Sequence, residues 1–169
     1  PADADGLSGA PWGRRASTEE LARWRSRLSH WKVPARFRRT VEAMRRVHRD
    51  HVLDQPGSIF REAHIASRCA SVLGASAVRL GSDPPDFELR LGDREVQCEA
   101  VEALARGRRR GAELKDERKL TPEARCAPRH VPSSEWTSAA DALSQIEAVA
   151  NAKSAKGYPD GTVLVIYLN

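Results

Sequence analysis

The sequence predicts a mixed α/β domain preceded by a separate, basic pair of helices. Three observations support this. Apolar residues recur at three-to-four spacing in two stretches before residue 54, which is typical of amphipathic helices. A further apolar stripe and three short strand-like segments follow between residues 58 and 104. The run VLVIYL at residues 163–168 is continuously apolar, which is typical of a buried strand.

Start and stop signals define the two basic helices. Ser17 and Glu20 form a capping-box pattern, and the helix that they begin is expected to continue to about Trp31. Pro34 is expected to break that helix. A second helix with apolar residues at the same spacing is then predicted as far as His48.

The domain boundaries follow from composition. Residues 1–16 are rich in Gly, Pro and Ala and are predicted to be a flexible lead. The helical hairpin occupies residues 17–54, and the turn-forming residues Asp54–Gly57 end it. The remaining residues, 58–169, are predicted to form the core domain, whose elements run in the order α-β-β-β-α-β.

In the core domain, Ser58 is expected to cap a helix that ends at Gly74. Strands are expected at Ala75–Leu80, Asp86–Leu91 and Arg94–Leu104. Residues 105–136 are predicted to be a long basic loop with a helical piece near 112–120. The last helix is expected to begin at Thr137 and to lead into the strand at 163–168.

The charge pattern suggests a partner. Residues 14–53 hold twelve Lys or Arg against four Asp or Glu, residues 54–105 hold five against nine, and residues 106–119 hold seven against three. Basic segments favour a phosphate backbone because their binding releases counterions. Clustered carboxylates hold hard divalent cations. This alternation is typical of a metal-dependent enzyme acting on nucleic acid, although either basic stretch alone could be a solvated helix face.

The second and third strands carry the candidate chemistry. Gly92 and Asp93 form a two-residue hairpin turn, and this turn sets Asp86 opposite Glu99. Strand alternation then places the polar side chains on one face. The apolar side chains fall on the other face, which is expected to be the core side: Phe87, Leu89, Leu91, Val96, Cys98 and Ala100. Two opposed carboxylates repel unless a cation or a proton lies between them. A polar strand face is also ordinary where a sheet meets solvent.

The segment PPDFELRLGDREVQCEA at residues 84–100 resembles the PD-(D/E)XK nuclease superfamily, whose core has the same α-β-β-β-α-β order. Pro85-Asp86 matches the start of the second core strand. Glu95-Val96-Gln97 matches the acidic-x-Lys motif except that Gln97 stands where Lys is usual. In a second alignment the motif is Gln97-Cys98-Glu99. Glu62 resembles the acidic residue that many members add to the metal site, and Lys153 and Lys156 resemble a frequent helix-to-strand ending.

The resemblance implies a restriction-endonuclease-like core at residues 58–169 and metal-assisted hydrolysis of phosphodiester bonds. It implies that Asp86 and Glu95 bind Mg²⁺ or Mn²⁺ and that Glu99 or Glu62 completes or tunes the site. The metal would lower the pKa of a bound water and neutralise charge on the phosphate. Gln97 can orient a water by hydrogen bonding but supplies no positive charge, so an arginine or a second metal would have to supply it.

DNA is the expected substrate in preference to RNA. The candidate nucleic-acid contacts lie in the two basic stretches: Arg38, Arg39, Arg45, Arg46, Arg108, Arg109 and Arg110.

Two other function classes remain open. Because Gln97 lacks the usual charge, the domain could be an inactive nuclease-fold module that binds nucleic acid or a protein within a larger assembly. Alternatively, an unrelated α/β protein could use the hairpin to bind a partner chain through Trp12, Trp24 and Trp31, since Trp is enriched at binding hot spots.

The sequence also bears on the compartment. No apolar run approaches the roughly 18–20 residues of a membrane span, so no membrane partner is expected. The three cysteines, Cys69, Cys98 and Cys126, show neither a disulfide framework nor a metal-ligand spacing. A reducing, cytoplasmic setting is therefore expected.

Overall fold

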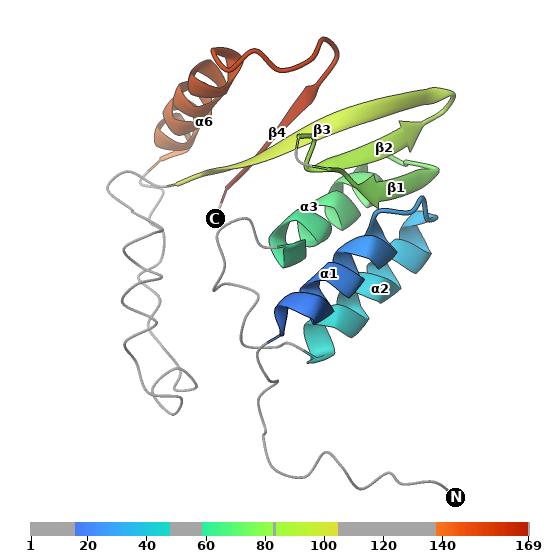
Figure 1. Ribbon diagram of the computed structural model, residues 1–169. Helices are drawn as coiled ribbons and strands as arrows, with labels where there is room; N and C mark the ends of the chain where they lie inside the picture. The colour runs from blue at the N-terminus through green and yellow to red at the C-terminus, as the bar shows by residue number, and fades with distance from the viewer. Residues whose placement is uncertain (1–15, 48–58, 83, 105–137, 169) are drawn as a thin grey trace, which may run out of the picture. The chain divides into compact units, whose positions relative to one another are not determined.

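The computed structural model describes residues 16–47, 59–82, 84–104 and 138–168. These residues form four helices and a four-stranded mixed sheet with the strand order β1-β2-β3-β4 (Figure 1). The chain divides into two compact units, Pro1–Gln97 and Cys98–Asn169.

Helix α1 spans Thr18–Leu28. Its capping box is confirmed, because the Ser17 hydroxyl accepts a hydrogen bond from the Glu20 backbone N–H at 3.2 Å. The Glu20 carboxylate in turn accepts one from the Ser17 backbone N–H at 2.9 Å. The helix ends three residues before Trp31, so the expected end was too late. The Ser29 N–H closes the last turn on the Arg25 carbonyl oxygen.

Helix α2 spans Pro34–Val47. Pro34 begins this helix, so the expectation that it breaks the preceding one was wrong. Proline suits the first helical position, where its fixed φ is already helical and no backbone N–H is needed. One face of α2 is buried through Phe37, Val41 and Met44, which follow the predicted apolar spacing.

Helix α3 spans Ile59–Val72 and supplies most of the buried helical surface in the first unit. The chain leaves it at Gly74, whose φ of 63° is the left-handed conformation expected after a helix end. Strand β1, Ala77–Leu80, follows almost at once. The predicted strand therefore began two residues too early, because Ala75 and Ser76 belong to the connection.

Strands β2, Phe87–Leu91, and β3, Arg94–Ala103, are neighbours in the sheet and are joined by the predicted two-residue turn. Gly92 occupies this turn with a φ of 58°. Glycine adopts positive φ without the steric penalty that a Cβ imposes. Strand β1 pairs antiparallel with β2, and Leu80 lies opposite Phe87 in this register.

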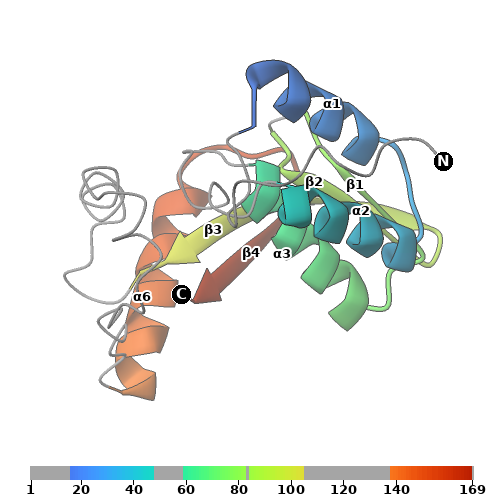
Figure 2. The same ribbon diagram turned by 90° about the horizontal axis from the view of Figure 1, so that it is seen from below.

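The core of the first unit lies between β1–β2 and the helices. The alternating side chains Val78, Leu80, Phe87 and Leu89 are all 0–1% exposed. Viewed from below, α1, α2 and α3 lie on the same side of these strands (Figure 2). The prediction that Phe87 and Leu89 face the core is confirmed. The remaining side chains of the two strands point to the opposite face of the sheet.

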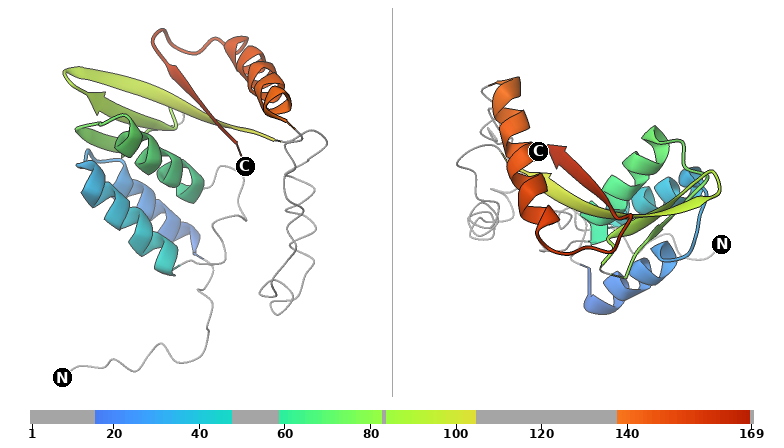
Figure 3. Two further views of the ribbon diagram at one scale, coloured as in Figure 1. Left: turned by 180° about the vertical axis from the view of Figure 1, so that it is seen from behind. Right: turned by 90° about the horizontal axis from the view of Figure 1, so that it is seen from above.

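In the second unit, helix α6, Ala139–Ser154, packs beside strand β4, Val163–Leu168 (Figure 3). Strand β4 runs parallel to the end of β3, and Cys98 pairs with Val163 in this register. The expectation that β4 is a buried strand was wrong for the described residues. Val163 is 43% exposed, and the middle of the strand is only half-buried. Continuous apolar character does not distinguish a covered strand from an uncovered one.

Several sequence predictions lie outside the described residues. They concern the lead, the turn at Asp54–Gly57, the cap at Ser58, the helical piece near residues 112–120 and the helix start at Thr137. Ser138, one residue after Thr137, caps α6 by accepting from the Asp141 backbone N–H at 3.1 Å. In the part of the chain that the structure describes, no helix is long and apolar enough to cross a membrane.

Candidate functional site

Two of the predicted metal ligands, Glu62 and Asp86, lie in the first unit on segments that pack near one another. Glu62 projects from the first turn of α3, and Asp86 lies directly before β2. The two carboxylates are close enough that the charge of Asp86 raises the pKa of Glu62. These residues are far apart in the sequence, and the packing of α3 against β2 brings them together.

Arg25 of α1 holds the Glu62 carboxylate. One guanidinium nitrogen lies 2.7 Å from Glu62 Oε2, and another donates to the Gly81 carbonyl oxygen at 3.2 Å. The Glu62 side chain is only 10% exposed, whereas the Arg25 side chain is 38% exposed. Arg25 therefore restrains the Glu62 side chain. Through its second hydrogen bond it also links Glu62 to the loop before β2.

The loop between Gly81 and Asp86 is tightly closed. The Gly81 backbone N–H donates to the Asp86 carbonyl oxygen at 2.9 Å, and the Pro84–Pro85 peptide bond within the loop is cis. A Cβ on Gly81 would lie 1.9 Å from the Pro85 carbonyl oxygen. Any larger residue there would force the backbone next to Asp86 to shift.

Several effects act on the Glu62 carboxyl. Burial is the largest and raises its pKa, because removal from water disfavours the charged form. Arg25 acts against this, and Asp86 raises the pKa further. The net direction is upward. A divalent cation beside Glu62 and Asp86 would relieve both unfavourable effects, and carboxylate oxygens are the ligands that Mg²⁺ prefers.

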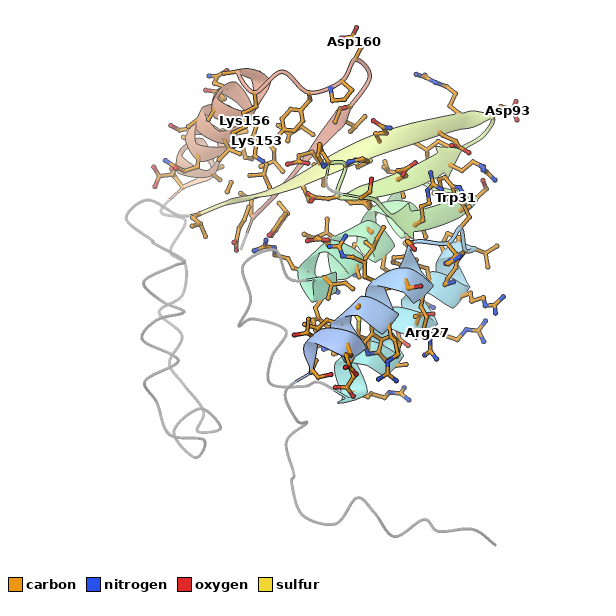
Figure 4. The ribbon with its side chains drawn as sticks, in the orientation of Figure 1. Arg27, Trp31, Asp93, Lys153, Lys156 and Asp160 are labelled. Atoms are coloured by element: carbon orange, nitrogen blue, oxygen red, sulfur yellow. The ribbon has the colours of Figure 1, made fainter. Side chains whose placement is uncertain are left out.

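The polar face of β1 and β2 forms a second, charged cluster. Arg79 pairs with Glu88 at 2.8 Å, and Arg90 pairs with Glu95 at 2.5 Å, which agrees with the predicted hairpin register. Trp31 lies with its ring centroid 4.6 Å from the Arg79 guanidinium carbon and 4.7 Å from that of Arg90 (Figure 4). Glu95, a predicted metal ligand, is thus engaged by an arginine and is half-exposed.

Glu99, another predicted ligand, belongs to a buried polar group in the second unit. Lys153 Nζ donates to Glu99 Oε1 at 2.9 Å and to the Tyr158 hydroxyl at 3.1 Å, and that hydroxyl donates to Glu99 Oε1 at 3.0 Å. Glu99 Oε2 is buried and has no hydrogen-bond partner among the residues that the structure describes. Burial lowers the pKa of Lys153, but its bonds to Tyr158 and Glu99 outweigh this and raise it overall.

Gln97, the residue at the usual lysine position, is exposed on β3. It belongs to the first unit, and Glu99 to the second. Among the described residues, no group of three or more His, Cys, Asp or Glu side chains is arranged to hold a metal ion. The predicted metal site of Asp86, Glu95, Glu99 and Glu62 thus stays a prediction. Of these residues, Glu62 and Asp86 interact electrostatically in the first unit.

The predicted nucleic-acid contacts on α2 are exposed: Arg38, Arg39, Arg45 and Arg46. Arg38 is partly engaged, with its Nε 3.7 Å from Glu42 Oε1. Arg108, Arg109 and Arg110 lie outside the described residues.

The role of Arg25 as the partner of Glu62 was not predicted, because in the sequence this residue is only one of several charges on the first helix. No local signal in the sequence indicates the pair of Arg25 with Glu62, because the two residues are 37 positions apart. No family model, curated protein or solved structure matches this chain.

Proposed function

We propose that this chain is a metal-dependent nuclease that hydrolyses phosphodiester bonds, with DNA as the preferred substrate, on a restriction-endonuclease-like core. The observation that supports the proposal is that α3, which carries Glu62, packs on β2, which begins directly after Asp86. These are two carboxylates of a predicted metal site on separate elements, and the charge of Asp86 contributes to raising the pKa of Glu62. Their oxygens suit Mg²⁺ or Mn²⁺. A bound cation would supply an acidified water and charge neutralisation at the phosphate.

The chain's own residues have distinct roles in this proposal. Asp86 offers its carboxylate from the end of the loop that the Gly81 N–H closes. Glu62 offers the oxygen that Arg25 does not bind, and Arg25 keeps the carboxylate in one orientation. Gln97 could orient a water by hydrogen bonding. A subset of the exposed arginines of α2 would hold the phosphate backbone.

The test uses plasmid and single-stranded DNA, incubated with Mg²⁺, Mn²⁺ or EDTA. We expect cleavage with either metal and none with EDTA. Asp86→Asn should abolish cleavage and also the rise in melting temperature that millimolar metal gives the wild type, because a ligand that binds only the native state stabilises it. Glu88→Gln is the matched control, since Glu88 is an acidic residue two positions further along the chain, in β2, and it pairs with Arg79.

An unchanged wild-type melting temperature at millimolar Mg²⁺ and Mn²⁺ would contradict the metal site. Cleavage that survives Asp86→Asn would contradict the role of Asp86. Gln97→Lys adds a further comparison, because restoring the usual cation should maintain or increase the activity of a working nuclease.

A second candidate is an inactive nuclease-fold module that binds nucleic acid or a protein partner. The pairing of three predicted ligands with cations favours it: Glu62 with Arg25, Glu95 with Arg90, and Glu99 with Lys153. Each cation already neutralises a carboxylate that the metal would otherwise need. DNA binding that depends on salt, without cleavage or metal stabilisation, would identify this module.

A further inference from the structure

The exposed surface of α2 divides into two sides. The helix is anchored by Phe37, Val41 and Met44, which are 0–8% exposed. Residues three, four and seven apart share one side of a helix. One side therefore carries Arg38 and Arg45, and Glu42 lies on the border between the two sides, three residues from Arg39 and four from both Arg38 and Arg46. The other carries Arg36, Arg39 and Arg46, and all of these residues are exposed.

The first side has mixed character. Glu42 Oε1 lies 3.7 Å from Arg38 Nε and offsets part of its charge. Arg45 lies near His64 of α3. Burial lowers the pKa of His64, and the charges of Arg45 and Arg68 lower it further. On this side, Glu42 and His64 are therefore neighbours of the arginines.

The second side is uniformly positive. In the described part of the chain, no carboxylate is within ion-pair distance of the Arg36, Arg39 or Arg46 guanidinium groups. Arg39 uses only its Nε–H, which donates to the Ala35 carbonyl oxygen at 3.4 Å. A guanidinium has five N–H donors, so the outward groups remain available to an anion.

Two more cations precede α2 in the chain. The Lys32 backbone makes two hydrogen bonds with Val78 of β1, at 3.1 and 2.9 Å, and these fix its position. Burial lowers the pKa of Lys32, and the charges of Arg36 and Arg27 lower it further. The three cations are therefore close enough to repel one another. Arg27, at the end of α1, lies over the Trp24 ring and is labelled in Figure 4.

We infer that these five residues form a phosphate track along which the backbone of a nucleic acid runs: Arg27, Lys32, Arg36, Arg39 and Arg46. The inference rests on the proposed nucleic-acid function and narrows it, because Arg38 and Arg45 then make no contact with the backbone. From Arg36 to Arg46 the track is about 15 Å long, at 1.5 Å per helical residue. Clustered cations without acidic partners gain most from a polyanion, since binding relieves their mutual repulsion and releases counterions. Contacts to phosphate alone carry no base specificity.

The test compares two double variants that remove the same charge from α2. Binding of a 20-base-pair duplex is followed by fluorescence anisotropy in EDTA, from 50 to 200 mM salt. Arg36→Ala with Arg39→Ala should weaken binding to all sequences. It should also reduce the slope of log affinity against log salt by about 0.9 for each lost contact. Arg38→Ala with Arg45→Ala should leave affinity and slope near the wild-type values. Circular dichroism checks that both variants fold.

Equal losses of DNA affinity in the two double variants would contradict the phosphate track. Nucleic-acid binding would then be an effect of overall charge. A wild-type chain that binds neither duplex nor single-stranded DNA would instead remove the proposed function, and the track with it. Tighter binding to vesicles of acidic phospholipid than to DNA at the same salt would assign the surface to a membrane and contradict the inference.

Discussion

At the scale of single residues, Glu62 combines burial, one cationic partner and a carboxylate neighbour. Its pKa is raised by burial and by Asp86, in spite of Arg25. A native state in which this pKa is raised binds the proton more tightly than the unfolded chain does. The stability that Glu62 contributes is therefore complete below its unfolded value of 4.5 and is lost as the pH rises through the folded pKa.

This linkage gives a prediction for Glu62→Gln, which cannot titrate. The free energy of unfolding of the wild type, minus that of the variant, should decrease as the pH is raised from 4 to 7. Urea unfolding at several pH values measures this difference. A difference for Glu62→Gln that increases with pH would mean that Arg25 dominates and that the pKa is lowered.

At the scale of elements, the end of α6 is anchored to β3 by side chains. The last turn of the helix supplies Lys153, which bonds to Glu99 of β3 and to Tyr158 in the connection to β4. The Lys153 and Glu99 side chains are 19% and 12% exposed. Buried charges of this kind are destabilising when one partner is lost, because the other stays without full compensation.

Lys153→Met should therefore lower the free energy of unfolding by roughly 1–3 kcal/mol, the usual cost of leaving a buried polar group without its partner. Lys156→Met is the matched control, because Lys156 is exposed and only three residues further along the chain. Thermal and urea unfolding compare the two variants. Equal effects would show that the bond to Glu99 adds little to stability.

At the scale of the whole molecule, the described core is unevenly distributed. Its buried apolar residues lie in the first unit, apart from Cys98 and Ala103. Helix α6 has no buried residue, and Leu143 on that helix is 59% exposed. Few buried apolar contacts imply a low free energy of local opening.

Amide hydrogen exchange should reflect this distribution. We expect the slowest exchange in α3, β1 and β2, and exchange that is faster by several orders of magnitude in α6. Mass spectrometry of peptic fragments gives the rates segment by segment. Uniform protection across both sets of elements would contradict the expected difference in local stability.

Local chemistry in the sequence determined much of the fold. The Ser17–Glu20 capping box, the Gly74 helix end and the turn at Gly92 each depend on residues a few positions apart. Strand alternation then gave the buried face that includes Phe87 and Leu89. These rules concern short-range sterics and hydrogen bonding, so a single sequence suffices to apply them.

Tertiary structure decided which charges meet. Arg25 reaches Gly81 across 56 positions and Glu62 across 37, and Lys153 reaches Glu99 across 54. Charge counts along the chain cannot supply such pairs, because they depend on how helices pack on strands. The same reason explains why β4 is only half-buried although its apolar sequence predicted burial. Whether a strand is covered depends on other elements of the fold. Glu62 and Asp86 were each chosen from the sequence, but packing alone brought the two carboxylates together.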